Sequence, residues 1–268
     1  MQPLTVRSCA PTAEDVKTTA APVAVFDSGI GGIGVLREIR KLLPHENLLY
    51  FGDTAMAPYG ERPPEEIRSL VTRHAARLLT SAKALVLACN TATAVAAEAL
   101  RGAWREIPII GMEPAIKPAL LEKKHKTVLV LATAATLREQ KLSRLLKAYQ
   151  GRATFYTCAA PCLVRLVEEG HLDDEVARRE IAALLDPILA RISPDAVVLG
   201  CTHFPFVAGT ISHFLGPSVP LFDGAEGTAR ELSRRLEAAG ICNKSTKRGR
   251  LVLTASSPAS LAVMQQLL

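Results

Sequence analysis

Aromatic residues are scarce in this chain of 268 residues, where Phe, Tyr and Trp together make up 4%. Surfaces that bind nucleic acids usually combine clustered basic residues with interleaved aromatic ones, so a net charge of +6 does not by itself predict such a surface. Arg138, Lys141, Arg144 and Lys147 recur at helical spacing. They are best explained as one solvated helix face, and the composition predicts no nucleic-acid partner.

Long uncharged apolar runs are also missing, which excludes a transmembrane segment of the usual length of about 18 residues or more. Residues 1–22 lack the continuous apolar core of a signal peptide. We interpret them as a flexible leader and expect a cytoplasmic protein that makes no contact with a membrane.

The sequence has six cysteines but no export signal, and the cytosol keeps thiols reduced, so disulfides are not expected. Cys158 and Cys162 are spaced C-x3-C, yet no second Cys or His pair stands nearby at ligand spacing. The sequence therefore predicts no metal site.

Short apolar runs alternate with helical patterns along most of the chain. Continuous Val, Ile and Leu runs are typical of strands buried on both faces, and alternation with helices predicts mainly parallel sheets covered by helices on both faces. The expected strands are residues 23–26, 48–51, 84–88, 107–110, 127–131, 153–156, 196–199 and 251–254, and the clearest helices are 35–43, 65–79, 92–104 and 138–149.

Two of these strand ends resemble each other. Cys89 and Cys201 each follow an apolar strand and precede polar residues and a helix, and they are 201 − 89 = 112 residues apart. This spacing predicts two pseudo-equivalent halves, which we expect to be pseudo-symmetric, three-layer α/β domains. We expect a first domain of residues 23–113 plus 225–268 and a second of residues 114–224.

A cysteine at the end of one buried strand is usually only a small apolar side chain. Two in matching surroundings favour a chemical role, because a thiol beside a helix N-terminus has a lowered pKa. Two separate thiols suit proton transfer on opposite faces of one substrate. Asp27 follows the first strand as a helix cap or a polar site residue, and His203 is a candidate proton partner for Cys201.

A glycine run supports a different interpretation. Residues 29–34 match G-x-G-x-x-G between a strand and a helix, and Asp53 stands where a ribose-binding acid belongs, which is typical of NAD(P)-dependent oxidoreductases. However, Asp27 would place negative charge beside the pyrophosphate, and both strand-end cysteines would have no role. A two-lobed binding protein for an acidic amino acid is the non-enzymatic alternative.

Four segments together resemble the aspartate/glutamate racemase superfamily, in the expected order: residues 26–32 (FDSGIGG), 50–60 (YFGDT and PYG), 88–93 (ACNTAT) and 200–205 (GCTHFP). The Cys-Thr-His form of the last segment favours glutamate racemases, because aspartate-specific relatives more often carry Glu in place of His203. The resemblance implies two domains that face each other, with the active site in the cleft between them. It also implies an isomerase without a cofactor or metal, which supplies D-glutamate for peptidoglycan synthesis. Members often form homodimers through different faces, which leaves the oligomeric state open.

The resemblance also implies roles for individual residues. Cys89 and Cys201 would exchange the α-proton, assisted by Asp27, His203 and Glu168, although Glu168 alone would be interpreted as an exposed helix residue. Contacts with glutamate are implied for Asp27, Ser28, Tyr59, Gly60, Asn90, Thr91, Thr133, Thr136, Thr202 and His203.

Overall fold

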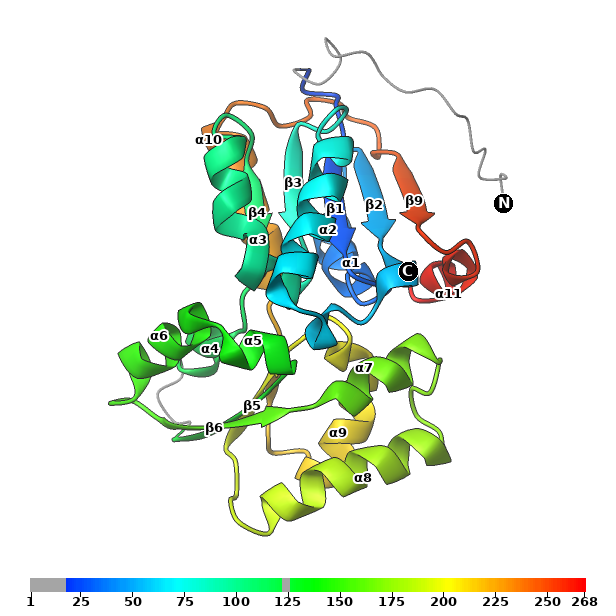
Figure 1. Cartoon of the computed structure of the whole chain (residues 1–268). Helices are drawn as coiled ribbons and strands as arrows, with labels where there is room; N and C mark the ends of the chain where they lie inside the picture. Colours follow the sequence, from blue (N-terminus) through cyan, green and yellow to red (C-terminus); the bar gives the residue numbers. More distant parts are fainter. Residues whose placement is uncertain (1–17, 122–125) are drawn as a thin grey trace.

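The computed structural model describes residues 18–121 and 126–268, so most of the expected leader lies outside the described residues. Figure 1 shows two lobes, each built around its own sheet. The first lobe, uppermost in Figure 1, contains five parallel strands in the order β4-β3-β1-β2-β9. These strands are β1 (Val23–Asp27), β2 (Leu48–Gly52), β3 (Ala84–Leu87), β4 (Ile109–Gly111) and β9 (Leu251–Ala255).

The second lobe contains four parallel strands in the order β6-β5-β7-β8. Read from the β8 edge, this order is fourth, third, first, second along the chain, and β4-β3-β1-β2 repeats it in the first lobe. The two halves therefore share a strand order, as the spacing of the cysteines predicts. The strands are β5 (Thr127–Ala132), β6 (Thr154–Ala159), β7 (Ala196–Gly200) and β8 (Leu221–Phe222).

Helices cover both faces of the first sheet. Val23 and Val25 pack with α1, α10 and α11 on one face, whereas Ala24 and Phe26 pack with α2 and α3 on the other. Alternate residues of a strand point to opposite faces, so this strand needs apolar side chains throughout. The helices are α1 (Ile33–Leu42), α2 (Pro64–Leu78), α3 (Asn90–Ala103), α10 (Ala225–Ala238) and α11 (Ser260–Gln266).

The second sheet is covered in the same way. Leu129 and Leu131 pack with α7, α8 and α9, while Val128 and Val130 pack with α4 and α6. One continuous cluster of buried apolar residues includes side chains of both lobes, such as Ile33 in the first and Phe204 in the second. The two lobes therefore share part of their core. The helices are α4 (Ile116–Ala119), α5 (Ala134–Arg138), α6 (Gln140–Tyr149), α7 (Pro161–Glu168), α8 (Glu175–Leu189) and α9 (Ala208–Leu215).

Some details differ from the expectations. The helix predicted over residues 138–149 forms as α6, but it begins two residues later, at Gln140, because the chain bends at Glu139 and leaves Arg138 at the end of α5. The strand predicted over residues 153–156 forms as β6, but it is an edge strand and is mostly exposed, not buried on both faces. The two-residue strand β8 was not expected. The proposed domain boundaries remain a prediction.

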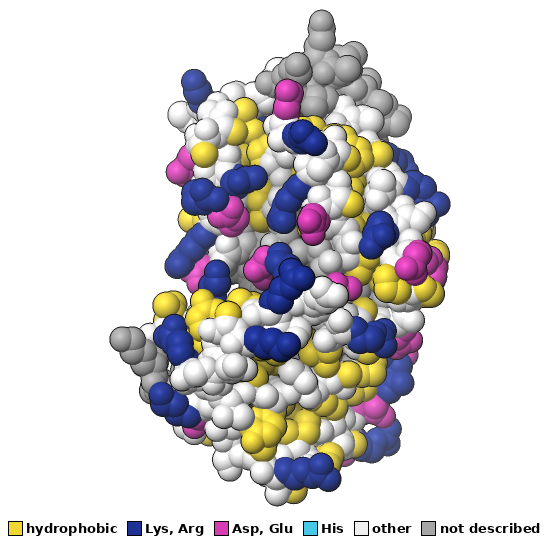
Figure 2. All heavy atoms as spheres, turned by 60° about the vertical axis from the view of Figure 1, so that its left-hand side comes forward, with side chains coloured by type: hydrophobic (Ala, Val, Ile, Leu, Met, Phe, Trp, Pro, Cys, Tyr) yellow, Lys and Arg dark blue, Asp and Glu magenta, His cyan; other side chains and the backbone are white. Residues whose placement is uncertain are grey.

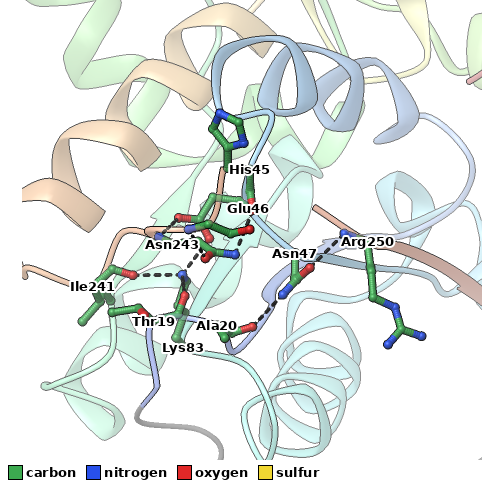
Figure 3. A network of polar contacts seen from close by, with 10 residues as sticks. Thr19, Ala20, His45, Glu46, Asn47, Lys83, Ile241, Asn243 and Arg250 are labelled. Atoms are coloured by element: carbon green, nitrogen blue, oxygen red, sulfur yellow. Dashed lines mark hydrogen bonds and ion pairs between the residues drawn. The ribbon is translucent and has the colours of Figure 1, made fainter. Parts of the chain in front are cut away.

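A buried polar network holds the C-terminal return against the first lobe (Figure 3). Nζ of Lys83 lies 2.6 Å from Oε2 of Glu46 and donates hydrogen bonds to the carbonyls of Thr19 and Ile241. The other oxygen of Glu46 accepts a hydrogen bond of 2.7 Å from the backbone N–H of Asn243. Both charged side chains are almost fully buried, so each depends on the other for compensation.

Figure 2 shows the Lys and Arg side chains of one face scattered among acidic ones, without a continuous basic stripe. None of the helices in the described part of the chain is long and apolar enough to cross a membrane.

Candidate active site

Both strand-end cysteines line one cavity of about 280 Å³ between the lobes. In each lobe the cysteine follows the third strand in chain order, β3 for Cys89 and β7 for Cys201. Ligands of parallel sheets bind beyond the carboxyl ends of strands, and the cavity lies there in both lobes. Eight of the residues predicted from the sequence line it: Ser28, Tyr59, Gly60, Cys89, Thr91, Thr133, Cys201 and His203.

Cys89 caps the N-terminus of α3, where its Sγ accepts a hydrogen bond of 3.4 Å from the backbone N–H of Ala92. Burial and the negative charge of Asp27 raise the pKa of Cys89 to about 12, although hydrogen bonds from Ser28 and Ala92 act in the opposite direction. The expectation of a lowered pKa at this helix terminus is therefore wrong. The free energy needed to remove the thiolate from water exceeds the stabilisation that the helix N-terminus gives it.

Cys201 has a different environment. Its Sγ lies 3.6 Å from Nδ1 of His203, and Nε2 of His203 lies 2.6 Å from Oε1 of Glu168. Burial alone would lower the pKa of His203, but its hydrogen bonds with Cys201 and Glu168 outweigh burial and hold that pKa well above the usual value. The imidazolium form therefore stands beside the sulfur, where it favours a thiolate.

Glu168 ends α7 and is only partly buried, but it is not a simple surface residue. The same Oε1 that contacts His203 accepts a hydrogen bond of 3.1 Å from the backbone N–H of Ile30 in the first lobe. Glu168 thus joins the lobes and supports His203 without lining the cavity itself.

Asp27 lies behind the cavity wall and is completely buried. Its carboxylate accepts hydrogen bonds from the backbone N–H of Gly29 (2.9 Å) and from the hydroxyl of Thr202 in the second lobe (3.1 Å). Burial raises the pKa of Asp27. Neither Asp27 nor Thr202 lines this cavity, and their contacts with a substrate stay a prediction.

Three threonine hydroxyls meet across the lobe boundary. Oγ1 of Thr91 lies 3.0 Å from Oγ1 of Thr133 and 3.4 Å from that of Thr136, and Thr133 donates to Thr136. Thr91 and Thr133 line the main cavity, whereas Thr136 and Asn90 line a neighbouring one of about 30 Å³. The buried amide of Asn90 has no hydrogen-bond partner among the described residues, so it is free to bind a polar group.

The turn Tyr59–Glu61 forms another part of the wall. The hydroxyl of Tyr59 donates to Oδ2 of Asp53 (2.7 Å), so its ring and not its hydroxyl is available to the cavity. A Cβ at Gly60 would lie 2.7 Å from Cβ of Thr133, and this close approach across the lobes requires glycine.

The glycine run has a similar explanation. A Cβ on Gly29 would meet the carboxylate of Glu168, and one on Gly31 would lie 2.6 Å from Oγ1 of Thr202 and 2.7 Å from the ring of His203. The second lobe therefore occupies the space next to these glycines, which argues against a dinucleotide site there.

The sequence-based analysis missed several residues of the wall, among them Glu61, Val164 and Arg138. Arg138 was assigned to a solvated helix face, and it is exposed, but it also lines the cavity. Its spacing relative to Lys141 gave no signal of this, because the bend between α5 and α6 separates the two residues. In residues 18–121 and 126–268, no three His, Cys, Asp or Glu side chains gather as metal ligands would.

Comparisons with known proteins agree with this geometry. The family described as Asp/Glu/hydantoin racemase matches residues 34–232. A glutamate racemase of Clostridium perfringens is 43% identical over 239 residues, which cover 89% of this chain and 91% of that protein.

Solved structures are similar over the same length. The crystal structure of glutamate racemase from Thermus thermophilus in complex with β-chloro-D-alanine matches with a TM-score of 0.76 and 37% identity over 94% of both chains. That from Francisella tularensis in complex with D-glutamate matches with a TM-score of 0.80 and 25% identity, over 93% of this chain and 94% of that one. The resemblance found in the sequence is confirmed, and the chain belongs to the Asp/Glu/hydantoin racemase family.

Proposed function

We propose that this protein is a glutamate racemase that interconverts L- and D-glutamate with two thiols and without a cofactor or metal. The observation that carries the proposal is that Cys89 and Cys201 come from equivalent strands of two lobes and line one cavity. Bases that approach from two lobes can reach opposite faces of one α-carbon. The choice of glutamate as the substrate rests on the relatives named glutamate racemase.

In the direction from L- to D-glutamate, the Cys201 thiolate removes the α-proton and becomes a thiol. The Cys89 thiol delivers its proton to the opposite face of the carbanion and becomes a thiolate. The reverse direction exchanges these roles. His203, held as an imidazolium by Glu168, stabilises the Cys201 thiolate, while burial keeps Cys89 protonated and ready to act as the acid.

The α-proton of an amino acid is much less acidic than a thiol, so the site has to stabilise a carbanion. The cavity supplies preorganised donors in the hydroxyls of Ser28, Thr91 and Thr133. The amide of Asn90 adds a polar group once the threonine cluster opens toward a substrate carboxylate. Such donors accelerate the reaction only to the extent that they bind the transition state more tightly than glutamate.

The proposal extends to the cellular role. The product, D-glutamate, would enter peptidoglycan synthesis, which connects the enzyme with cell-wall biogenesis and cell shape. We propose that the enzyme is cytoplasmic and that glutamate is its small-molecule substrate. We also propose a homodimer, which analytical ultracentrifugation can test.

The deciding experiment follows L-glutamate in D2O with no added cofactor. We expect the optical rotation to fall to zero while deuterium enters the α-position, as seen by NMR. Glutamate binding without exchange would overturn the proposal in favour of a binding protein. Faster exchange of aspartate would indicate an aspartate racemase, and a titration followed by NAD(P)H fluorescence tests the oxidoreductase.

A further inference from the structure

The charges around the cavity are unevenly distributed. Asp27 and Glu168 place carboxylates behind its inner wall, and the two thiols can add negative charge. Glutamate carries two carboxylates and one ammonium group, and therefore a net charge of −1 at neutral pH. Cationic groups on the cavity wall attract such a substrate, and the imidazolium of His203 supplies one beside Cys201. Among the described residues that line the cavity, Arg138 is the only Lys or Arg.

Arg138 belongs to the solvent-exposed part of this cavity wall. Cys89 and Cys201, on the same wall, are only 5% and 7% exposed. The wall therefore includes both buried thiols and an exposed guanidinium.

The backbone of Arg138 is held in helix α5, but its guanidinium has no partner in the part of the chain that the structure describes. Arg138 is the last residue of α5, whose first turn is capped by Oγ1 of Thr133 accepting from the N–H of Thr136. No hydrogen bond or ion pair joins the guanidinium to any described residue. By contrast, Lys141 pairs with Glu113 and Arg144 donates to Gln140. Arg138 thus differs from these neighbours in that its guanidinium has no partner among the described residues.

We infer that Arg138 is a specificity residue that binds the distal carboxylate of the substrate. A guanidinium presents two parallel N–H groups that match a carboxylate, and such bidentate pairs recognise carboxylates more selectively than an ammonium group does. The inference rests on the proposed racemase activity and adds to it the group that distinguishes an acidic side chain from a neutral one.

The test compares Arg138→Gln and Arg138→Lys with Arg144→Gln, a matched control on the exposed side of α6. For Arg138→Gln we expect the KM for L-glutamate to rise roughly 10- to 100-fold, the range expected when one charged hydrogen-bonded contact is lost. We expect kcat to change less than threefold. The inhibition constant of L-glutamine, which has an amide instead of the distal carboxylate, should change less than twofold.

Ionic strength provides a second readout. The KM of the wild type should rise with added salt, that of Arg138→Gln should lose most of this dependence, and Arg138→Lys should retain it at an intermediate KM. Equal losses for glutamate and glutamine, or a KM in Arg138→Gln like that of Arg144→Gln, would overturn the inference. If the wild type itself exchanges no α-proton, the proposed function fails instead, so the two failures are distinguishable.

Discussion

Cys89 and Cys201 occupy equivalent places in two lobes with the same strand order, yet their surroundings differ. Cys201 is next to His203 and Glu168, a chain of contacts of 3.6 and 2.6 Å that favours a thiolate. Cys89 lies near the carboxylate of Asp27, and burial raises its pKa to about 12. The shared topology sets the positions of the two thiols, whereas unrelated neighbours set their protonation states.

This difference has a kinetic consequence. The enantiomers of glutamate have equal free energies, so kcat/KM has to be the same in both directions at every pH. An asymmetry between the thiols therefore appears in isotope exchange, in kcat and KM taken separately, and in the reactivity of each cysteine. The predictions below use these measurements, from the largest expected effect on activity to the smallest.

Removing either thiol should have the largest effect. We expect Cys89→Ala and Cys201→Ala each to lose racemisation by about a thousandfold or more, since each removes one acid or base. Cys89→Ala should still exchange the α-proton of L-glutamate in D2O with retention, and Cys201→Ala that of D-glutamate. Cys158→Ala, a partly buried cysteine away from the cavity, is the control. Normal racemisation by both variants would refute the two-thiol mechanism.

Glu168→Gln should weaken only the Cys201 side. Loss of the carboxylate removes one of the interactions that raise the pKa of His203, so less imidazolium stands beside Cys201 at neutral pH. We expect kcat/KM to fall roughly 10- to 100-fold. Alkylation of Cys201 by iodoacetamide at pH 7 should slow down, while that of Cys89 changes less than twofold. Equal slowing at both cysteines would mean that Glu168 acts on the whole site.

The pH dependence of Cys89 should reveal its raised pKa. In the Cys201→Ala variant, the thiolate fraction of a group with a pKa of about 12 increases about tenfold per pH unit between pH 7 and 10. Alkylation of Cys89, mapped by mass spectrometry, should follow this slope without a plateau. Adding Asp27→Asn should move the curve to lower pH, because the negative charge of Asp27 is one cause of the shift. A plateau near pH 9 would contradict the raised pKa.

Lys83→Met should destabilise the fold without changing the relative reactivity of the two active-site cysteines. It removes the partner of the buried Glu46 carboxylate, at a cost of about 3–5 kcal/mol in the free energy of unfolding. Urea denaturation measures this loss, and Lys83→Met with Glu46→Leu should recover most of it. We expect kcat/KM and the alkylation ratio of the two cysteines to stay within twofold of the wild type. A changed ratio would show that this network reaches the active site.

Much of the fold could be predicted because it depends on local pattern. Apolar runs such as residues 196–199 form strands almost where expected, since a strand buried on both faces needs a continuous apolar run. The exposure of strand β6 and the bend at Glu139 were not predicted, because both depend on which elements pack beside them. Eight of the thirteen residues assigned to the site line the cavity, whereas the other five lie behind or beside it: Asp27, Asn90, Thr136, Glu168 and Thr202.

The sequence by itself determined the α/β class, the paired cysteines at equivalent strand ends and the resemblance to racemases, because each is contained in short, contiguous segments. Only the tertiary structure decided the raised pKa of Cys89, the burial of Asp27 and the place of Arg138 at the cavity. Asp27 and its partner Thr202 are 175 positions apart, and Glu168 and Ile30 are 138 apart. Desolvation and charge pairing depend on distances in space, so they follow from the packing of the two lobes and not from local sequence.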